Sequence, residues 1–394
     1  MGQPINRQVL FVSACAGILM FGIVLAILGT VFGLPVMRER LHINLAQQGN
    51  LFLLLYLGIF IASVVVGPVI DNIGNKATLL VSSAVVGVAM VLFGSAECLA
   101  WAAMAAVLLG LGGGGLNTST NVLISDVYGE NRGPMLNLLG MFFGIGALCI
   151  PLLAASIEGR FSIPQLFFCC AALSVVCAMA YACLKFPPAI GSQQVFSMRA
   201  TLGVARYPGV MFIALLLFFE SGNEACIGGW TSTYANASGF SSRTATLILA
   251  GYWAALMLSR ILVASTFRAT SKTILVLASG LLSLVGCGLL LASHSLLALS
   301  LGVAVIGFTY GPIFPTALAI AGDRYTNTGT VFGLLFSVAL IGGMAWPWSV
   351  GQISQSFSVR AGMSMPLIGA VGICILAALI HQSERQATGG EGLH

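Results

Sequence analysis

Long apolar stretches alternate with short polar connections along the whole chain. Crossing the hydrocarbon core of a bilayer takes about 20 predominantly apolar residues in an α-helix. Uninterrupted apolar runs of this length are typical of helices rather than of barrel strands. The pattern therefore predicts an all-α membrane protein with twelve transmembrane helices. The predicted spans are 9–33, 48–70, 77–97, 99–125, 134–157, 164–184, 209–236, 240–265, 272–293, 296–321, 327–351 and 361–381.

Composition supports lipid as the solvent of this chain. Apolar residues make up 58% of the 394 positions and charged residues only 7%, whereas a soluble chain carries about 25% charged residues. The net charge of +5 is not gathered into a basic stripe, so nucleic acid is not an expected partner. The ten cysteines lie almost entirely in apolar runs and form no CxxC pair. We interpret them as packing residues and predict neither a metal site nor a cofactor.

One longer polar connection divides the twelve spans into six and six. It runs over 185–208 and carries Lys185, Arg199 and Arg206. The predicted organisation is an N-terminal six-helix bundle at 1–184, a cytoplasmic linker at 185–208, and a C-terminal six-helix bundle at 209–394.

Landmark residues of the fourth and fifth spans recur in the tenth and eleventh. Gly110 precedes Asp126 by 16 positions, and Gly307 precedes Asp323 by the same interval. After one deleted residue, Gly146 and Pro151 fall on Gly342 and Pro347. Such a parallel repeat is found in transporters with two related halves, and it predicts two pseudo-symmetric bundles.

The basic residues predict the orientation in the membrane. With the N-terminus in the cytoplasm, 11 of the 16 Lys and Arg residues lie on or near that side, as the positive-inside rule requires. An even number of spans places the C-terminus there as well. The first apolar run is followed by no small-residue cleavage site, so we expect a retained span in the inner (plasma) membrane.

Two acidic residues occur near the middle of the span 209–236. Glu220 and Glu224 are four positions apart and so share a helix face. A charge at the bilayer centre costs about 2.5–3.5 kcal/mol on the insertion scale. Since two such charges also repel each other, at least one carboxyl is expected to hold a proton near neutral pH. A proton-coupled carrier needs such a group in its cavity; the alternative is a protonated Glu that bonds a neighbouring helix.

The fourth span carries a glycine-rich stretch followed by two amides on one face, Asn117 and Asn121. The glycines formally contain GxGxxG, but no strand precedes them, so we interpret Gly110 and Gly114 as a close-packing surface. The amides either join helices, at about 0.6–2 kcal/mol, or bind a neutral polar solute such as a sugar. Aromatic side chains can stack on a sugar or mark the membrane interface. The candidates are Trp230, Tyr252, Trp253, Tyr310 and Trp346.

The connection between the second and third spans reads Gly67-Pro-Val-Ile-Asp71-Asn-Ile-Gly74-Asn-Lys76. Asp71 can cap or pair with neighbouring helix ends, Gly74 permits a tight turn, and Lys76 is placed at the cytoplasmic headgroups. These features fit a gating element. Further gating contacts are expected at the same face, from Asp126, Arg132, Asp323 and Arg324.

Two further features affect the second half of the chain. Pro312 and Pro315 each remove a hydrogen bond from the tenth span and predict a kink, which is either a flexible gate or a static bend. Arg260, near the end of the eighth span, either extends to the headgroups or pairs with Asp323 or Glu220.

Together these patterns resemble the major facilitator superfamily, and within it the branch of fucose, galactose and glucose proton symporters. The closest likeness is to bacterial glucose/mannose symporters and fucose permeases. The resemblance is carried by the Asp71 connection, Asn117 and Asn121 ahead of Asp126, residues 142–151, Gly222-Asn223-Glu224, Ser259-Arg260-Ile261-Leu262, and residues 313–318.

The resemblance implies two six-helix halves that rock about a central site lined by the first, fourth, seventh and tenth spans. The superfamily usually has Arg after the Asp of its signature loop, where this chain has Asn72. Fucose permeases carry an acidic residue in the first span, whereas 9–33 contains no charge here. Their glucose-transporting relatives keep a Glu in the seventh span, which Glu224 matches. The resemblance thus implies proton coupling at Glu224, beside Glu220, with solute contacts that include Asn223.

The sequence therefore predicts a secondary active transporter and not an enzyme. The leading hypothesis is proton-coupled import of a neutral, glucose-like monosaccharide by alternating access, through a monomer in a bacterial inner membrane. The alternative is proton-driven efflux of drug-like or lipid-like substrates, which the two carboxyls fit well and the paired amides fit poorly. A membrane enzyme or sensor is disfavoured because the sequence has no HExxH motif and no intramembrane Ser/His pair.

Overall fold

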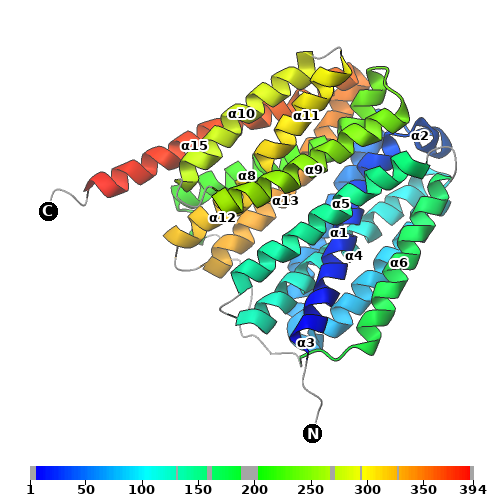
Figure 1. Ribbon diagram of the computed structural model, residues 1–394, viewed down its shortest axis with the longest axis horizontal. Helices are drawn as coiled ribbons and strands as arrows, with labels where there is room; N and C mark the ends of the chain where they lie inside the picture. The colour runs from blue at the N-terminus through cyan, green and yellow to red at the C-terminus, as the bar shows by residue number, and fades with distance from the viewer. Residues whose placement is uncertain are drawn as a thin grey trace, which may run out of the picture. The chain divides into compact units, whose positions relative to one another are not determined.

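A computed structural model describes residues 6–129, 132–157, 162–187, 203–266, 271–292, 295–325 and 328–390. Throughout these ranges the secondary structure is helical. The helices are α1 (Arg7–Phe32), α2 (Pro35–Leu41), α3 (Leu45–Ser95), α4 (Leu99–Tyr128), α5 (Arg132–Ile157), α6 (Ile163–Cys183), α8 (Pro208–Ala237), α9 (Ser242–Thr266), α10 (Lys272–Ala292), α11 (Leu296–Tyr310), α12 (Ile313–Arg324), α13 (Thr328–Ser356), α14 (Val359–Gly362) and α15 (Met365–Gly390) (Figure 1).

The described helices account for all twelve predicted spans. Eleven helical segments are long and apolar enough to cross a membrane. One of them, α3, has 51 residues and contains two of the predicted spans. Another combines α11 and α12 into a single span. The predicted all-α architecture is therefore confirmed, and the short helices α2 and α14, which hydropathy did not indicate, lie in connections between spans.

A break at Gly74 divides α3 into its two spans. Gly74 has φ 84° and ψ 163°, a backbone conformation that residues other than glycine rarely adopt. The tight turn that the sequence predicts is present at this position. Within α3, Pro68 lies before the break and Lys76 lies after it.

The helices form two compact units. The first comprises Met1–Val195 with Ser241–Ala250, and the second comprises Phe196–Phe240 with Gly251–His394. The predicted linker at 185–208 falls largely on 188–202, which lies outside the described residues, so its role stays a prediction.

In the first unit, α4 packs closely against both halves of α3. A methyl group added at Gly110 would lie 2.0 Å from the carbonyl oxygen of Leu55, before the break. One added at Gly112 would lie 2.8 Å from the carbonyl oxygen of Ser82, after the break. The glycine-rich stretch thus brings helix backbones together, as small residues do between membrane helices.

The sequence repeat is matched by equivalent close contacts in the two units. In each unit, one glycine of the repeat meets the second membrane-spanning segment of the unit and the other meets the first. At all four glycines, an added methyl group would lie 2.0–2.5 Å from a carbonyl oxygen of the helix it meets. The pairs are Gly110 with Leu55, Gly307 with Tyr252, Gly146 with Leu19, and Gly342 with Phe218. These contacts support the prediction of two pseudo-symmetric six-helix halves.

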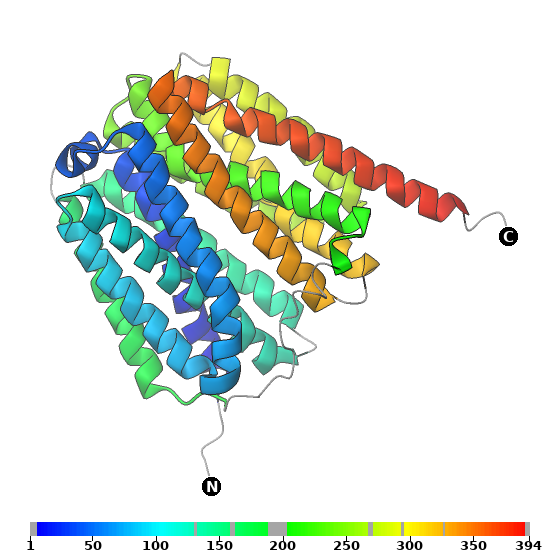
Figure 2. The ribbon, with the colours of Figure 1, turned by 180° about the vertical axis from the view of Figure 1, so that it is seen from behind.

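In the second unit, α8 packs against α11, α12, α13, α14 and α15. The long helix α15 runs beside α10 in both ribbon views (Figures 1 and 2). Side chains on several faces of α8 are therefore buried. This helix carries both acidic residues of the predicted site.

Candidate functional site

The two carboxyls on α8 have different surroundings. The side chain of Glu220 is fully buried, with 0% of its surface exposed. Its Oε2 accepts a hydrogen bond from Ser221 Oγ at 3.1 Å, and its Oε1 has no partner among the described residues. The side chain of Glu224, one turn further along, is 20% exposed.

A cation reaches Glu224 from α9. Arg260 Nη2 lies 3.8 Å from Glu224 Oε2, and the Arg260 side chain is 29% exposed. The sequence suggested the headgroups, Asp323 or Glu220 as partners of Arg260, and the structure shows Glu224 instead. The position of Arg260 along its helix could not indicate this pairing, because the long side chain can extend in either direction from its Cα atom.

The same arginine contacts the break in the tenth span. Arg260 Nε donates a hydrogen bond to the carbonyl oxygen of Gly311 at 3.1 Å. Gly311 and Pro312 separate α11 from α12, and Pro315 lies in the first turn of α12. A break in a helix leaves carbonyl groups without an intrahelical donor, and Arg260 supplies one here.

Asn223 and Tyr310 are buried together within the second unit. Asn223 Nδ2 donates to Tyr310 Oη at 2.9 Å and to the carbonyl oxygen of Pro366 at 3.0 Å. Both side chains are 0% exposed. These contacts join α8 to α11 and to the start of α15. The predicted solute contacts of both residues stay predictions.

The three candidate tryptophans occupy different environments. Trp230 is fully buried and its Nε1 donates to the carbonyl oxygen of Pro347 at 3.1 Å, which joins α8 to α13. Trp253 is 3% exposed and packs against Gly228. Trp346 is half-buried between the rings of Phe218 and Phe219. Of the three, Trp346 has the most accessible surface for a solute.

In the first unit, the two amides of α4 bond to each other. Asn121 Nδ2 donates to the backbone oxygen of Asn117 at 2.8 Å and to its Oδ1 at 3.1 Å. Both side chains are half-buried. These hydrogen bonds stay within α4, so among the described residues the two amides do not join α4 to another helix.

The connection around Gly74 has a clear set of local contacts. Lys76 Nζ donates to the carbonyl oxygens of Ala182 and Leu184, at 2.7 and 2.9 Å, and thereby caps the C-terminus of α6. Asn72, which stands where the family usually has Arg, bonds the carbonyl oxygen of Pro68 at 2.8 Å. Asp71 lies close enough to Asp126 to interact with it electrostatically. The side chain of Arg132 lies outside the described residues.

At the corresponding end of the second unit, charged residues pair between helices. Asp323 on α12 forms an ion pair with Lys272 on α10. Arg324 Nη2 lies 2.5 Å from Glu384 Oε1 on α15. Thr273 Oγ1 donates to Glu384 Oε2 at 2.7 Å and contacts His381 Nδ1 at 3.0 Å. The sequence indicated Asp323 and Arg324 but not their partners, Lys272 and Glu384. The available signal was the position of these partners, because Lys272 begins one span and Glu384 follows the predicted end of another.

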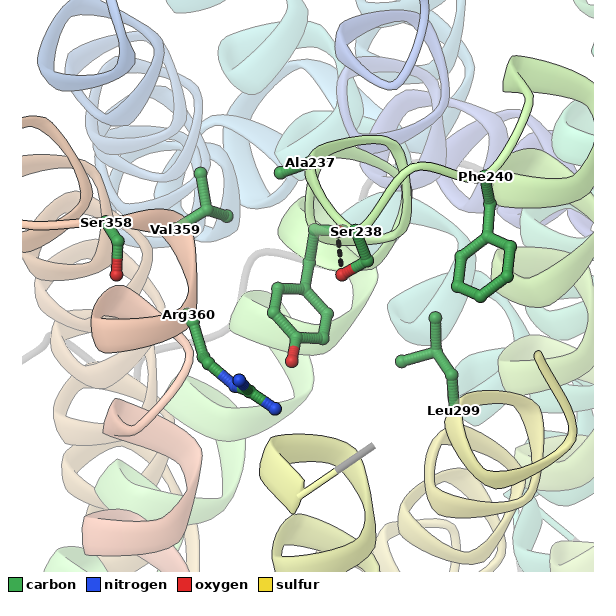
Figure 3. A pocket seen from close by; sticks show the side chains of 8 residues that line it. Ala237, Ser238, Phe240, Leu299, Ser358, Val359 and Arg360 are labelled. Carbon is green, nitrogen blue, oxygen red and sulfur yellow. Dashed lines mark hydrogen bonds between the residues drawn. The ribbon is translucent and has the colours of Figure 1, made fainter. Parts of the chain in front are cut away.

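A separate cavity of about 280 Å³ lies in the second unit, ten residues beyond Glu224 on α8 (Figure 3). Arg360, Phe240 and Leu299 point toward it, while the Ser238 hydroxyl bonds the backbone of Tyr234. Its lining consists of Tyr234, Ala237, Ser238, Phe240, Leu299, Ser358, Val359 and Arg360. This set shares no residue with the predicted site.

Comparison with known families identifies the architecture. Residues 14–347 match the family model described as Major Facilitator Superfamily, which is well over half of the chain. The chain belongs to the Major Facilitator Superfamily. As a member of this superfamily it is a multi-pass membrane protein of the transporter type.

Individual relatives are distant. The Saccharomyces cerevisiae protein named Bypass of stop codon protein 6 is 23% identical over 370 residues, which cover 83% of this chain and 73% of that protein. The solved structure of the nucleoside transporter NupG matches with a TM-score of 0.77 at 14% identity, covering 96% of this chain and 99% of its own. The Escherichia coli fucose:proton symporter FucP matches with a TM-score of 0.64 at 19% identity, covering 94% and 98%. At these identities the structural matches show the fold of this superfamily member and leave its solute open.

Proposed function

We propose that this superfamily member is a proton-coupled importer of a neutral, glucose-like monosaccharide that works by alternating access. The observation that carries the proposal is a pair of carboxyls at mid-helix on α8, of which one is buried and one is partly exposed beside Arg260. A buried ionisable group inside a membrane is costly, and such groups mark ion and substrate pathways.

The choice of a neutral solute rests on the paired amides. Asn117 and Asn121 are half-buried, carry no charge and offer both donors and acceptors. Trp346 adds a partly accessible aromatic face of the kind that can stack on the C–H surface of a sugar ring. We propose the inner membrane of a bacterium as the location, with both termini in the cytoplasm and the monomer as the working form.

The proposal is tested with the purified chain in proteoliposomes. An inward proton gradient should drive uptake of one member of a radiolabelled monosaccharide panel above its external concentration, and a protonophore should abolish that accumulation. Uptake driven by an inward sodium gradient instead would show that Na⁺, and not the proton, is the coupling ion. If neither gradient drives uptake of any sugar in the panel, the proposed function is wrong.

The principal alternative, efflux of cationic drug-like or lipid-like compounds, is tested by ligand-induced stabilisation of the purified protein in detergent. Carboxyls in an apolar setting suit a cationic substrate, since they supply the counter-charge. Under that alternative, lipophilic cations should raise the melting temperature of the detergent-solubilised protein while sugars leave it unchanged. The proposal of sugar import expects the opposite result.

A further inference from the structure

We infer that the mobile proton resides on Glu220, and that Arg260 is a positioning residue that keeps Glu224 ionised and connects it to the break between α11 and α12. This inference rests on the proposed function, which did not distinguish the two carboxyls, whereas the family resemblance implied proton coupling at Glu224. It assigns a separate role to each.

The surroundings of Glu220 favour its neutral form. An ionised carboxylate accepts up to about four hydrogen bonds, and a buried one needs a cation or several donors to offset the loss of water. Among the described residues, Glu220 has one hydroxyl donor, Ser221, and no ion-pair partner. Its Oε1 is buried with no partner. A proton on Glu220 removes the charge that this environment does not compensate.

The surroundings of Glu224 favour its charged form. Its side chain is 20% exposed, and the guanidinium of Arg260 lies 3.8 Å away. A partly exposed ion pair of this kind keeps both partners ionised. One cation cannot fully neutralise two carboxylates, so the pair can hold a single negative charge at low cost and not two.

Other charged groups of the second unit are engaged elsewhere. Lys272 pairs with Asp323, and Arg324 pairs with Glu384. Arg360 donates to the carbonyl oxygen of Leu291. The described tyrosine, cysteine and histidine residues from α9 to α15 are Tyr252, Cys287, Tyr310, Tyr325, Cys374 and His381, of which Tyr325 lies against Gly209 at the start of α8. Glu220 interacts electrostatically with Glu224 and Arg260 alone among the described charged residues.

Arg260 can transmit the protonation state of Glu220 to the helix break. Release of the proton from Glu220 to water leaves two carboxylates on one face of α8 and a single arginine that interacts with both. The guanidinium is then drawn toward the new charge, and its hydrogen bond to the carbonyl oxygen of Gly311 competes with that attraction. Since Gly311 and Pro312 already interrupt the tenth span, the two charge states favour different geometries at this break.

Infrared difference spectroscopy of the purified full chain tests the assignment without any solute. Raising the pH should deprotonate the buried carboxyl and remove the C=O stretching band of a protonated glutamate. This difference band should be absent in Glu220→Gln and present in Glu224→Gln and in the control Glu97→Gln, whose carboxyl is exposed in a connection. Loss of the band in Glu224→Gln with retention in Glu220→Gln would overturn the assignment.

The role of Arg260 has its own spectroscopic readout. In Arg260→Gln, Glu224 loses its cation and should take up a proton, so a second C=O band appears. The double variant Arg260→Gln/Glu224→Gln should lose that added band and keep the original one. A loss of folding cannot produce this pattern, and each variant is first shown to elute as a single species. If Arg260→Gln adds no band, Arg260 does not keep Glu224 ionised.

Transport then separates the inference from the proposed function. In proteoliposomes, Glu220→Gln should equilibrate the sugar without concentrating it, and its uptake should not respond to the proton gradient. The positioning role predicts that Arg260→Lys retains more of the gradient response than Arg260→Gln. If the wild-type chain concentrates no sugar while the infrared pattern holds, the proposed function fails and the assignment of the proton stands.

Discussion

Polar side chains inside a membrane protein either hold helices together or serve the transported solute, and their hydrogen bonds distinguish the two roles. Asn223 donates two hydrogen bonds to other helices of its own unit, while the hydrogen bonds of the Asn117 and Asn121 side chains stay on α4. Spacing on one helix face predicted Asn117 and Asn121 either as solute contacts or as contacts between helices, and the family resemblance implied a solute contact for Asn223. The structure gives Asn223 a packing role in addition, and whether it also reaches a solute stays a prediction.

We therefore expect opposite effects from two alanine substitutions. Asn223→Ala removes the donor to Tyr310 and to the carbonyl oxygen of Pro366, and leaving buried groups unpaired costs about 1–3 kcal/mol. Asn117→Ala removes a half-buried amide whose hydrogen bonds lie within its own helix, so stability should change by less than about 0.5 kcal/mol. As a proposed solute contact, its loss should instead raise the KM for sugar uptake. Thermal unfolding in detergent measures the stability of both variants, and uptake into proteoliposomes measures the KM. Unchanged stability in Asn223→Ala together with a raised KM would show that Asn223 acts on the solute.

At the residue scale, the sequence predicted which side chains matter better than it predicted their partners. The four-residue spacing of Glu220 and Glu224 follows directly from helix geometry. The approach of Arg260 to Glu224 could not be predicted from the sequence, because it depends on how α9 packs against the break between α11 and α12. The different burial of the two carboxyls depends on the same packing, and the sequence shows no asymmetry between them.

The helices were largely predictable because the thickness of the bilayer sets their length. Most predicted spans coincide with a helix to within a few residues. The exceptions are the tenth span, which is divided between α11 and α12, the last span, whose helix α15 continues to Gly390, and a turn so tight that two spans form one continuous helical segment. This occurs in α3, where Gly74 alone separates the spans. Hydropathy locates such a junction, and the presence of glycine indicates the backbone conformation that it needs.

Gly74→Ala is expected to destabilise the first unit. The backbone at φ 84° and ψ 163° lies in a region that is essentially restricted to glycine, so a side chain there costs about 1–3 kcal/mol. Gly87→Ala in the same helix is the control, since its added methyl group would meet neighbours at 3.7 Å, an ordinary contact distance. Thermal unfolding of both variants in one detergent gives the comparison. Equal melting temperatures would show that the break tolerates a side chain.

The whole molecule combines two related six-helix units, and membership of the Major Facilitator Superfamily accounts for this architecture. Family and fold do not identify the solute, because a few side chains select it on a shared scaffold. The distant relatives illustrate this: a nucleoside transporter and a fucose symporter match the same chain over nearly its whole length. The sequence repeat therefore indicates how the helices pack but does not indicate which solute the protein binds.

If the two units arose by duplication, equivalent glycines should respond alike to substitution. Gly146 and Gly342 each bring their helix against the first helix of their unit, and an added methyl group would lie 2.1 Å from the carbonyl oxygen of Leu19 or 2.0 Å from that of Phe218. Backbone atoms cannot move aside as a flexible side chain can. Overpacking of this kind costs about 1–3 kcal/mol, so Gly146→Ala and Gly342→Ala should both lower the melting temperature.

Each substitution has a control on its own helix. Gly140 on α5 and Gly333 on α13 have no neighbouring atom within 4 Å of an added methyl group. Alanine favours a helix over glycine by about 0.5–1 kcal/mol, so Gly140→Ala and Gly333→Ala should leave stability unchanged or raise it. A response in only one unit would mean that the matching glycines have different packing roles. In that case the repeat would describe the order of the helices but not the energetics of their contacts.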